Sequence, residues 1–204
     1  MKIPAFNLRR SIFHICLGLS IISLSLIFKT NFLWFLFGVI VLGIAVSLLS
    51  LKIKIPFIHR MLLIFEKPKY LEVFPGKGAL FFMAGCLLVL KLFSPNIALA
   101  SIAILTFGDS ISHLIGLSVG KIKHRWPFSE LKNIEGTIVG AIAAFIAASF
   151  FVRPLFALIA SVIAMLAEAL TLQLGGDNVD DNLIVPIIAG TIIYLLTNYW
   201  AILI

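Results

Sequence analysis

The sequence predicts an all-α, polytopic integral membrane protein with about seven transmembrane helices, and three observations lead to this fold class. First, 61% of its 204 residues are hydrophobic and only 12% are charged, whereas a typical soluble protein is about 45–50% apolar and about 25% charged. Second, the mean hydropathy is +1.15, so hydrocarbon must act as the solvent for most of the chain. Third, apolar runs of roughly 20 residues, the length of helix that crosses a bilayer, recur from end to end.

Seven apolar runs define the predicted spans, which cover residues 11–28, 32–50, 77–94, 97–119, 135–152, 154–172 and 183–203. The connections near residues 29–31, 94–96 and 153–154 are very short, which predicts that the flanking helices form antiparallel hairpins. The first run follows basic residues, as a signal peptide does, but we expect it to be retained as a span. With no internal repeat or interdomain linker, we expect residues 1–204 to form a single transmembrane catalytic domain.

The distribution of lysine and arginine predicts a cytoplasmic N-terminus and an outer C-terminus. With this orientation only Lys29, Lys91 and Arg153 lie in or near outer loops, and the other thirteen basic residues lie on the cytoplasmic side. This is the bias known as the positive-inside rule. The net charge of +7 is then explained by contact with anionic headgroups rather than by nucleic acid. We expect a multi-pass protein of the cell membrane, or of the endoplasmic reticulum if the chain is eukaryotic.

The acidic residues all fall on the predicted cytoplasmic side. They are Glu66, Glu72, Asp109, Glu130, Glu135, Glu168, Asp177, Asp180 and Asp181. Each lies in a cytoplasmic loop or in the central-to-inner part of a span, and none lies in an outer loop. A channel or carrier usually needs polar groups along a path through the membrane. The asymmetry therefore favours an enzyme that works at the inner surface.

The first candidate constellation begins with Gly108 and Asp109 in the fourth apolar run. A carboxylate at the bilayer centre costs about 2.5–3.5 kcal/mol on insertion scales, so it needs a partner, a cation or water. Helical spacing places Asp109 on one face with Ser112, His113, Gly116 and Gly120. Glycines there would let a backbone or a phosphate approach closely. The alternative is a small-residue contact between helices with a hydrogen-bonded aspartate.

The run from Gly116 to Lys121 superficially resembles a phosphate loop. It departs from the Walker pattern, since three residues separate the glycines and Ile122 follows the lysine. What remains is a glycine-flanked helix end beside basic residues, which suits an anion. A solvated basic loop would have the same sequence character.

The second constellation is Lys132 with Glu135 and Gly136, where a basic loop enters the fifth span. A carboxylate near a helix N-terminus is favoured by the helix dipole. Glu135 is therefore either a site residue or simply a helix-start carboxylate.

The third constellation is the polar stretch 175–182, which contains Asp177, Asp180, Asp181 and Asn182. Its carboxylate and amide oxygens are ligands that hard cations prefer, and Mg²⁺ is usually held by one or two carboxylates together with phosphates. The spacing excludes an EF-hand, and a polar turn in water is the alternative. Glu168, about one turn inside the sixth span, could assist a metal site or bond to the helix of Asp109.

Arg10 and His14 are four residues apart at the start of the first span and so share a helix face. They could contact a phosphate or a headgroup. A snorkelling arginine beside a buried histidine is the plainer explanation.

Taken together, these motifs resemble the polyprenol kinase family, which includes dolichol kinase, phytol kinase and a CTP-dependent diacylglycerol kinase. The resemblance runs in order along nearly the whole chain, through Arg9-Arg10 with His14, Gly108-Asp109 with Gly116 and Gly120, Lys132 with Glu135-Gly136, and Asp180-Asp181-Asn182-Leu183 with Pro186. The set is fairly specific jointly. Asn133 departs from it, because a serine is expected at that position.

The resemblance implies a kinase that uses CTP and a divalent cation such as Mg²⁺ to phosphorylate the hydroxyl of a membrane isoprenoid alcohol of the polyprenol, dolichol or phytol type. We assign the catalytic residues as Asp109, Asp181, Lys132 and Glu135, and the metal ligands as Asp109, Asp180 and Asp181. The nucleotide-binding residues assigned are Gly108, Ser112, Gly116, Gly120, Lys121, Gly136 and Asn182. The expected partners are the lipid alcohol, a nucleoside triphosphate and membrane lipids.

Two other functions compete with the kinase. A CTP:lipid cytidylyltransferase would also carry a glycine–aspartate segment and late aspartates, but the sequence Asp-Asp-Asn-Leu favours the kinase. A small transporter could use Asp109 and Glu168 as a midplane site, and inverted hydropathy repeats, which this chain lacks, would support it. The residues leave open the particular alcohol, CTP against ATP, the general base and the oligomeric state.

Overall fold

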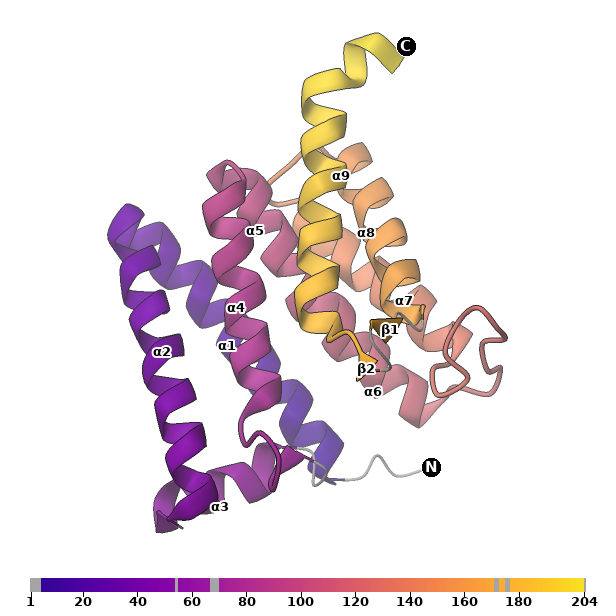
Figure 1. The fold of residues 1–204 in the computed structure, drawn as a ribbon. Coiled ribbons are helices and arrows are strands. Elements are labelled where there is room, and N and C mark those ends of the chain that lie inside the picture. The colour runs from indigo at the N-terminus through magenta and orange to yellow at the C-terminus, as the bar shows by residue number, and fades with distance from the viewer. Residues whose placement is uncertain (1–4, 54, 67–69, 171–172, 175–176, 204) are drawn as a thin grey trace.

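The computed structural model describes residues 5–53, 55–66, 70–170, 173–174 and 177–203. The chain runs back and forth as a bundle of helices, with a two-stranded hairpin at one end (Figure 1). In order, the elements are α1 (Ala5–Phe28), α2 (Thr30–Lys52), α3 (Pro56–Phe65), α4 (Lys77–Leu92), α5 (Pro95–Ala103), the π-helical segment η2 (Ile104–Asp109), α6 (Ser110–Ser118), α7 (Ile134–Ala148), α8 (Pro154–Ala169), β1 (Gln173–Leu174), β2 (Asp177–Asn178) and α9 (Asp181–Leu203).

The predicted helical architecture is confirmed, since each of the seven apolar runs forms helix in the described residues. Within the part of the chain that the structure describes, four helices are long and apolar enough to cross a bilayer, namely Ala5–Phe28, Asn31–Lys52, Pro95–Ser118 and Asp181–Trp200. The helices α7 and α8 are apolar but shorter. The number of seven spans and the cytoplasmic N-terminus stay predictions.

Three elements, namely α3, β1 and β2, were not expected from the sequence. The second predicted loop contains α3, whose first helical residue is Pro56, a favourable position because proline has no N–H to leave unpaired there. The polar stretch before α9 contains the antiparallel pair β1–β2, in which Gln173 lies opposite Asn178 and Leu174 opposite Asp177.

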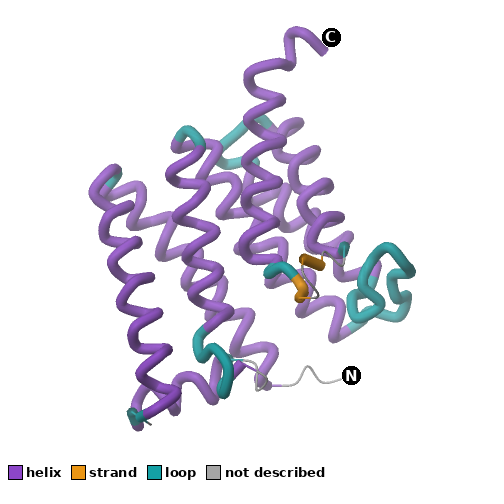
Figure 2. The backbone as a smooth tube through the Cα atoms, viewed as in Figure 1, coloured by secondary structure: helices purple, strands orange, loops and turns teal. Residues whose placement is uncertain are grey.

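The connections differ at the two ends of the bundle. The short links α1–α2, α4–α5 and α7–α8 lie at one end with the C-terminus, as Figures 1 and 2 show. The longer segments α2–α4, α6–α7 and α8–α9 lie at the other end, on the same side as the start of α1. We call this second end the polar end, because its loops carry most of the charged residues.

The continuous helix Pro95–Ser118, formed by α5, η2 and α6, is the most deeply buried of the candidate spans. Its α5 portion is buried over residues 97–103, and small residues on neighbouring helices, including Ala144, Ala148, Ala160 and Ala164, are also fully buried. Small side chains let helix backbones approach closely, which is how helices commonly associate in membranes. The Asp109 end of η2 is thereby held inside the bundle.

Glycines make the contact between this central helix and α7. A Cβ atom built on Gly140 would lie 2.7 Å from the Cβ of Ser112 and 2.8 Å from the carbonyl oxygen of Gly108. On Gly136 it would lie 2.6 Å from the carbonyl oxygen of Ser112 and 3.1 Å from the Cα of Gly116. Gly108, Ser112, Gly116 and Gly136 therefore form a close helix–helix contact, the alternative that the sequence had offered for the first constellation.

This contact predicts opposite effects for two glycine substitutions. Gly140→Ala should destabilise the fold by roughly 1–3 kcal/mol, because the added methyl group overpacks a backbone contact. Gly38→Ala on α2 should be neutral or stabilise by roughly 0.5–1 kcal/mol, since alanine favours a helix interior and nothing lies within 4 Å of a Cβ there. Thermal unfolding in detergent measures both, and equal melting temperatures would contradict the close packing.

Candidate functional site

A cavity of 370 Å³ opens at the polar end of the bundle. Its walls come from α1, the central helix, the α6–α7 loop, the end of α8 and the start of α9, with further residues from the α3–α4 segment. The polar lining residues are Arg10, Ser11, His14, Glu66, Tyr70, Asp109, His113, Ser129, Lys132, Glu168, Asp180, Asp181 and Asn182. A concave site with convergent charged groups is a typical candidate for catalysis or binding.

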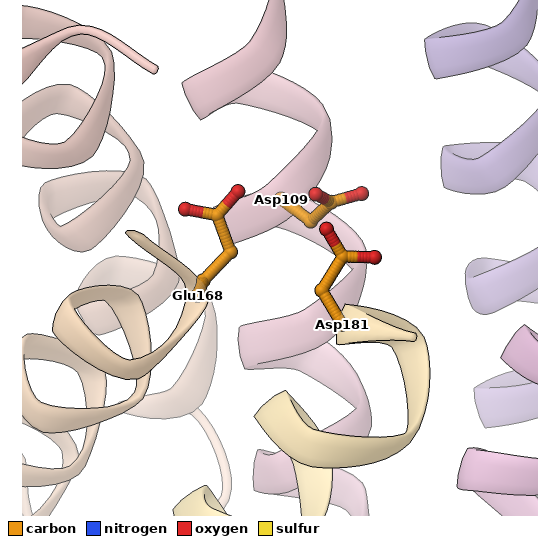
Figure 3. A group of neighbouring side chains, drawn as sticks. All are labelled: Asp109, Glu168 and Asp181. Carbon is orange, nitrogen blue, oxygen red and sulfur yellow. The ribbon is translucent and has the colours of Figure 1, made fainter. Parts of the chain in front are cut away.

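Three carboxylates converge in this cavity. Asp109, Glu168 and Asp181 each offer an oxygen atom, and these atoms all lie within 4.8 Å of one another. Figure 3 shows the three side chains pointing toward one another from three separate helical segments. We call this group the carboxylate cluster.

Each member is positioned by the end or the irregularity of a helix. Asp109 is the last residue of η2, a wide π-helical turn, and such turns frequently occur at functional sites because they rotate the following residues. Asp181 is the first residue of α9, where a negative charge is favoured by the helix dipole. Glu168 lies in the last turn of α8, where that dipole is unfavourable, so it depends on another partner.

Lys132 is that partner. Its ammonium group forms an ion pair with the Glu168 carboxylate, donates to the backbone carbonyl of Glu168 at 2.6 Å, and lies 3.3 Å from the Asp181 carboxylate. Burial by itself would lower the pKa of Lys132, but the carboxylates of Glu168, Asp181 and Asp109 together raise it. The lysine therefore stays protonated and brings the α6–α7 loop onto the ends of α8 and α9.

Two buried oxygen atoms in the site have no hydrogen-bond partner among the described residues. They are Glu168 Oε2 and Asn182 Oδ1. An unsatisfied buried polar atom costs about 1–3 kcal/mol, and a bound cation or ligand would remove that cost. The oxygen-only donor set of the carboxylate cluster suits a hard cation such as Mg²⁺, which takes carboxylate and phosphate oxygens. The residues present thus fit a divalent cation.

His14 approaches the cluster from α1. Its Nδ1 lies 3.9 Å from a carboxylate oxygen of Asp109, and its ring packs against Phe82, with the ring centroids 5.3 Å apart. Glu66, at the end of α3, is also buried, and its carboxylate accepts a hydrogen bond of 3.1 Å from the backbone N–H of Gly78. His14 and Glu66 bring two further ionisable groups to the cavity wall beside Asp109.

Two of the three predicted metal ligands lie in the carboxylate cluster, and the third lies outside it. Asp109 and Asp181 lie in the carboxylate cluster together with Glu168, whereas Asp180 lines the cavity outside it. The Asp180 carboxylate accepts hydrogen bonds from the backbone and side-chain amides of Asn182, at 3.2 and 2.8 Å. Burial and the charge of Asp181 raise the pKa of Asp180. The side chain of Asp177 and residues 175–176 lie outside the described residues.

The other predicted residues lie away from the cavity lining. These are Gly108, Ser112, Gly116, Gly120, Lys121, Glu135 and Gly136. The Glu135 carboxylate accepts hydrogen bonds from the backbone N–H groups of Lys121 and Ile122, at 2.9 and 3.1 Å. Asn133, where a serine was expected, donates to the carbonyl oxygen of Gly116 at 2.6 Å. These bonds fix the loop that carries Lys132.

Sequence reasoning did not single out Glu66 and Tyr70, which also line the cavity. The only feature of the sequence that could have indicated them is that they follow the short apolar run that forms α3. That run is too short to cross a bilayer, so its length gives no signal that one of its sides faces a cavity.

Two relatives are found among known proteins. The chain is 31% identical over 186 residues to the uncharacterized protein MJ1137 of Methanocaldococcus jannaschii, a match that covers 90% of this chain and 91% of that protein. It is 26% identical over 136 residues to CTP-dependent diacylglycerol kinase 1 of Schizosaccharomyces pombe, covering 58% of this chain and 60% of that enzyme. No family model matches the chain, and no solved structure matches it.

The Lys132 ion pairs predict a stability effect that exposed lysines do not share. Lys132→Met should destabilise the protein by roughly 2–3 kcal/mol, because Glu168 would be left buried without its cation. Adding Glu168→Gln should restore part of the loss by removing the uncompensated charge. Lys123→Met is the matched control, since Lys123 lies in the same loop and is exposed. Equal melting temperatures for Lys132→Met and Lys123→Met at neutral pH would contradict the role assigned to Lys132.

Proposed function

The chain belongs to the same family as the uncharacterized protein MJ1137, and from this starting point we propose that it is a membrane-bound, CTP-dependent lipid kinase. The observation that carries the proposal is the convergence of Asp109, Glu168, Asp181 and Lys132 in one cavity at the polar end. The similarity to CTP-dependent diacylglycerol kinase 1 supports CTP as the phosphoryl donor and a membrane lipid as the acceptor.

The cavity suits phosphoryl transfer because that reaction depends mainly on positioning and on neutralisation of charge. A divalent cation held by Asp109, Glu168 and Asp181 would supply positive charge beside the phosphates. Lys132 supplies a fixed positive charge of its own, and it is positioned by Glu168 and Asp181 before any substrate arrives. Preorganised charge of this kind acts most strongly in a site shielded from water.

The reaction transfers one phosphoryl group. The acceptor hydroxyl oxygen attacks the γ-phosphorus of CTP, and the bond from that phosphorus to the β–γ bridging oxygen breaks. CDP leaves, the lipid becomes a phosphate monoester, and the hydroxyl proton passes to a carboxylate. Asp109 is the proposed proton acceptor, since its carboxylate lies beside His14 at the α1 wall. Lys132 orients the phosphates directly, and Asp181 would do so through the cation that it helps to hold.

The remaining assigned residues act indirectly in this proposal, by positioning other residues of the site. Glu135 is a positioning residue, because it holds the backbone at Lys121 and Ile122 rather than the cavity itself. The glycines and Ser112 allow α6 and α7 to pack closely enough to bring Lys132 to the carboxylates. Asp180 and Asn182 fix the start of α9, from which Asp181 enters the cluster.

Two acceptor classes are supported by different observations. The motif set along the sequence favours an isoprenoid alcohol of the polyprenol, dolichol or phytol type. The curated relative is named for diacylglycerol. Both present one hydroxyl group on an apolar body, so the same cavity could serve either.

A turnover screen tests the function. Purified protein with CTP should transfer label to a lipid acceptor from γ-labelled but not from α-labelled CTP, and the acceptors to compare are polyprenols, phytol and diacylglycerol. Label from α-labelled CTP in the lipid would instead identify a cytidylyltransferase. Protein-dependent transport that needs Asp109 but no CTP would identify a transporter.

Substitutions in the cluster should abolish this transfer. Asp109→Asn and Asp181→Asn should each lower turnover by at least about 100-fold, because each removes a carboxylate that would hold the cation beside the reacting phosphates, and Asp109→Asn also removes the proposed proton acceptor. Glu130→Gln, which removes an exposed carboxylate from the loop of Lys132, should leave turnover unchanged. Full activity in both aspartate variants, with their folds intact, would overturn the site assignment.

Metal dependence is a separate expectation. Chelation with EDTA should stop transfer, and Mg²⁺ should restore it. Without nucleotide or lipid, Mn²⁺ should bind the wild-type protein, as measured by electron paramagnetic resonance, and bind Glu168→Gln more weakly because a cluster ligand is lost. Undiminished Mn²⁺ binding in Glu168→Gln would exclude Glu168 as a ligand.

A further inference from the structure

A second, mainly apolar cavity of 170 Å³ lies beside the carboxylate site. One wall is formed by Arg10, Phe13 and His14 of α1. The other walls are formed by Ile58, Met61, Leu62 and Phe65 of α3, by Glu66, and by Gly76, Gly78 and Ala79 at the start of α4. We call this space the α3 cavity. None of the functions assigned so far uses it.

The α3 cavity adjoins the catalytic cavity. Four residues line both spaces, namely Arg10, His14, Glu66 and Gly78. Polar side chains flank Gly78 at the shared wall, because a Cβ atom built on Gly78 would lie 3.7 Å from a Glu66 carboxylate oxygen and 3.8 Å from His14 Nε2, within ordinary van der Waals contact. Asp109 lies directly behind this wall, 3.9 Å from His14. Polar groups therefore separate an apolar space from the carboxylate cluster.

The helix α3 has the character of a helix at a membrane surface. It packs against α1 through Phe13 and Phe65, whose stacked rings have centroids 4.9 Å apart. It lies across the polar end, at a steep angle to α2 (Figure 1). Phe57 and Leu63 are 73% and 54% exposed, and Arg60 is exposed beside them. Apolar side chains with a basic residue on a short surface helix are typical of helices that lie in the headgroup region.

We infer that the α3 cavity binds the hydrocarbon segment nearest the hydroxyl group of the lipid acceptor. The hydroxyl would lie at the shared wall, between His14 and Glu66, with Asp109 behind it. The rest of the chain would pass between α1 and α3 into the bilayer. This assignment rests on the proposed kinase function, and it adds the place and the chemical character of the acceptor subsite.

The two cavities differ in chemical character, and each suits a different part of the two substrates. The carboxylate site offers Lys132 and cation-binding oxygens, which suit a triphosphate. The α3 cavity offers aromatic and aliphatic side chains, which suit hydrocarbon. A molecule with a hydroxyl group on an apolar body would fit the boundary between them.

Photolabelling tests the subsite without requiring turnover. The probes are a polyprenol and a diacylglycerol that each carry a diazirine within the first few carbons from the hydroxyl. At least one probe should label residues 58–65 or 76–79 of the wild-type protein in detergent, as mapped by mass spectrometry. Labelling by both probes only outside these segments would overturn the inference, even if the protein is an active kinase. Labelling here without any transfer from CTP would retain the lipid subsite and reject the kinase.

A pair of adjacent leucines gives the matched variants. Leu62 lines the α3 cavity, whereas Leu63 is exposed on the same helix. Leu62→Trp should fill the cavity, suppress the labelling, and lower kcat/KM for the lipid acceptor by about tenfold or more through loss of acceptor positioning. Leu63→Trp should leave both unchanged. CTP binding should be the same in both variants, because the carboxylate site is not altered.

A second variant, on another wall of the α3 cavity, keeps the test conclusive if Leu62→Trp does not fold. Ala79→Leu adds bulk from α4 rather than from α3, and it should produce the same loss of labelling with CTP binding retained. If both cavity-filling variants fold, bind CTP and are labelled like the wild type, the α3 cavity does not hold the lipid.

Discussion

The ammonium group of Lys132 holds together a cluster of negative charge that would otherwise repel itself. Asp109, Glu168 and Asp181 come from three helical segments, and their oxygen atoms lie within 4.8 Å of one another. Lys132 pairs with two of them and also bonds the last turn of α8. A buried charge network of this kind is costly unless its members are paired, and Lys132 supplies that pairing for Glu168 and Asp181.

The packing of the bundle explains how that network can exist inside an apolar protein. Glycine and alanine let the central helix and α7 approach closely, and this contact places the α6–α7 loop over the ends of α8 and α9. The side chains of Glu135 and Asn133 then hold the two sides of the loop together through hydrogen bonds with the backbone of Lys121 and Gly116. Gly108, Gly116 and Gly136, which were predicted to bind the nucleotide, lie at this helix–helix contact, and in the proposed function they act by positioning Lys132.

The polar end combines two environments that a lipid kinase must keep adjacent. Charged groups face the carboxylate cavity, while the neighbouring space between α1, α3 and α4 is lined mainly by apolar side chains. His14 and Glu66 lie at the boundary, where an acceptor hydroxyl would meet a nucleotide. The exposed apolar residues of α3 are consistent with a helix that contacts lipid rather than water.

The sequence by itself determined the positions of the helices that form from the seven long apolar runs and the end of the bundle at which the acids collect, because the length of an apolar run and the order of charges are local properties. It also singled out Asp109, Asp181, Lys132 and, as an assisting acid, Glu168. Only the tertiary structure decided that Glu168 rather than Asp180 completes the carboxylate cluster, and that α3 encloses a cavity. Both outcomes depend on how each helix is rotated about its own axis. The π-helical turn that ends at Asp109 and the close packing of glycines fix this rotation. The periodicity of the sequence does not specify it to the single residue.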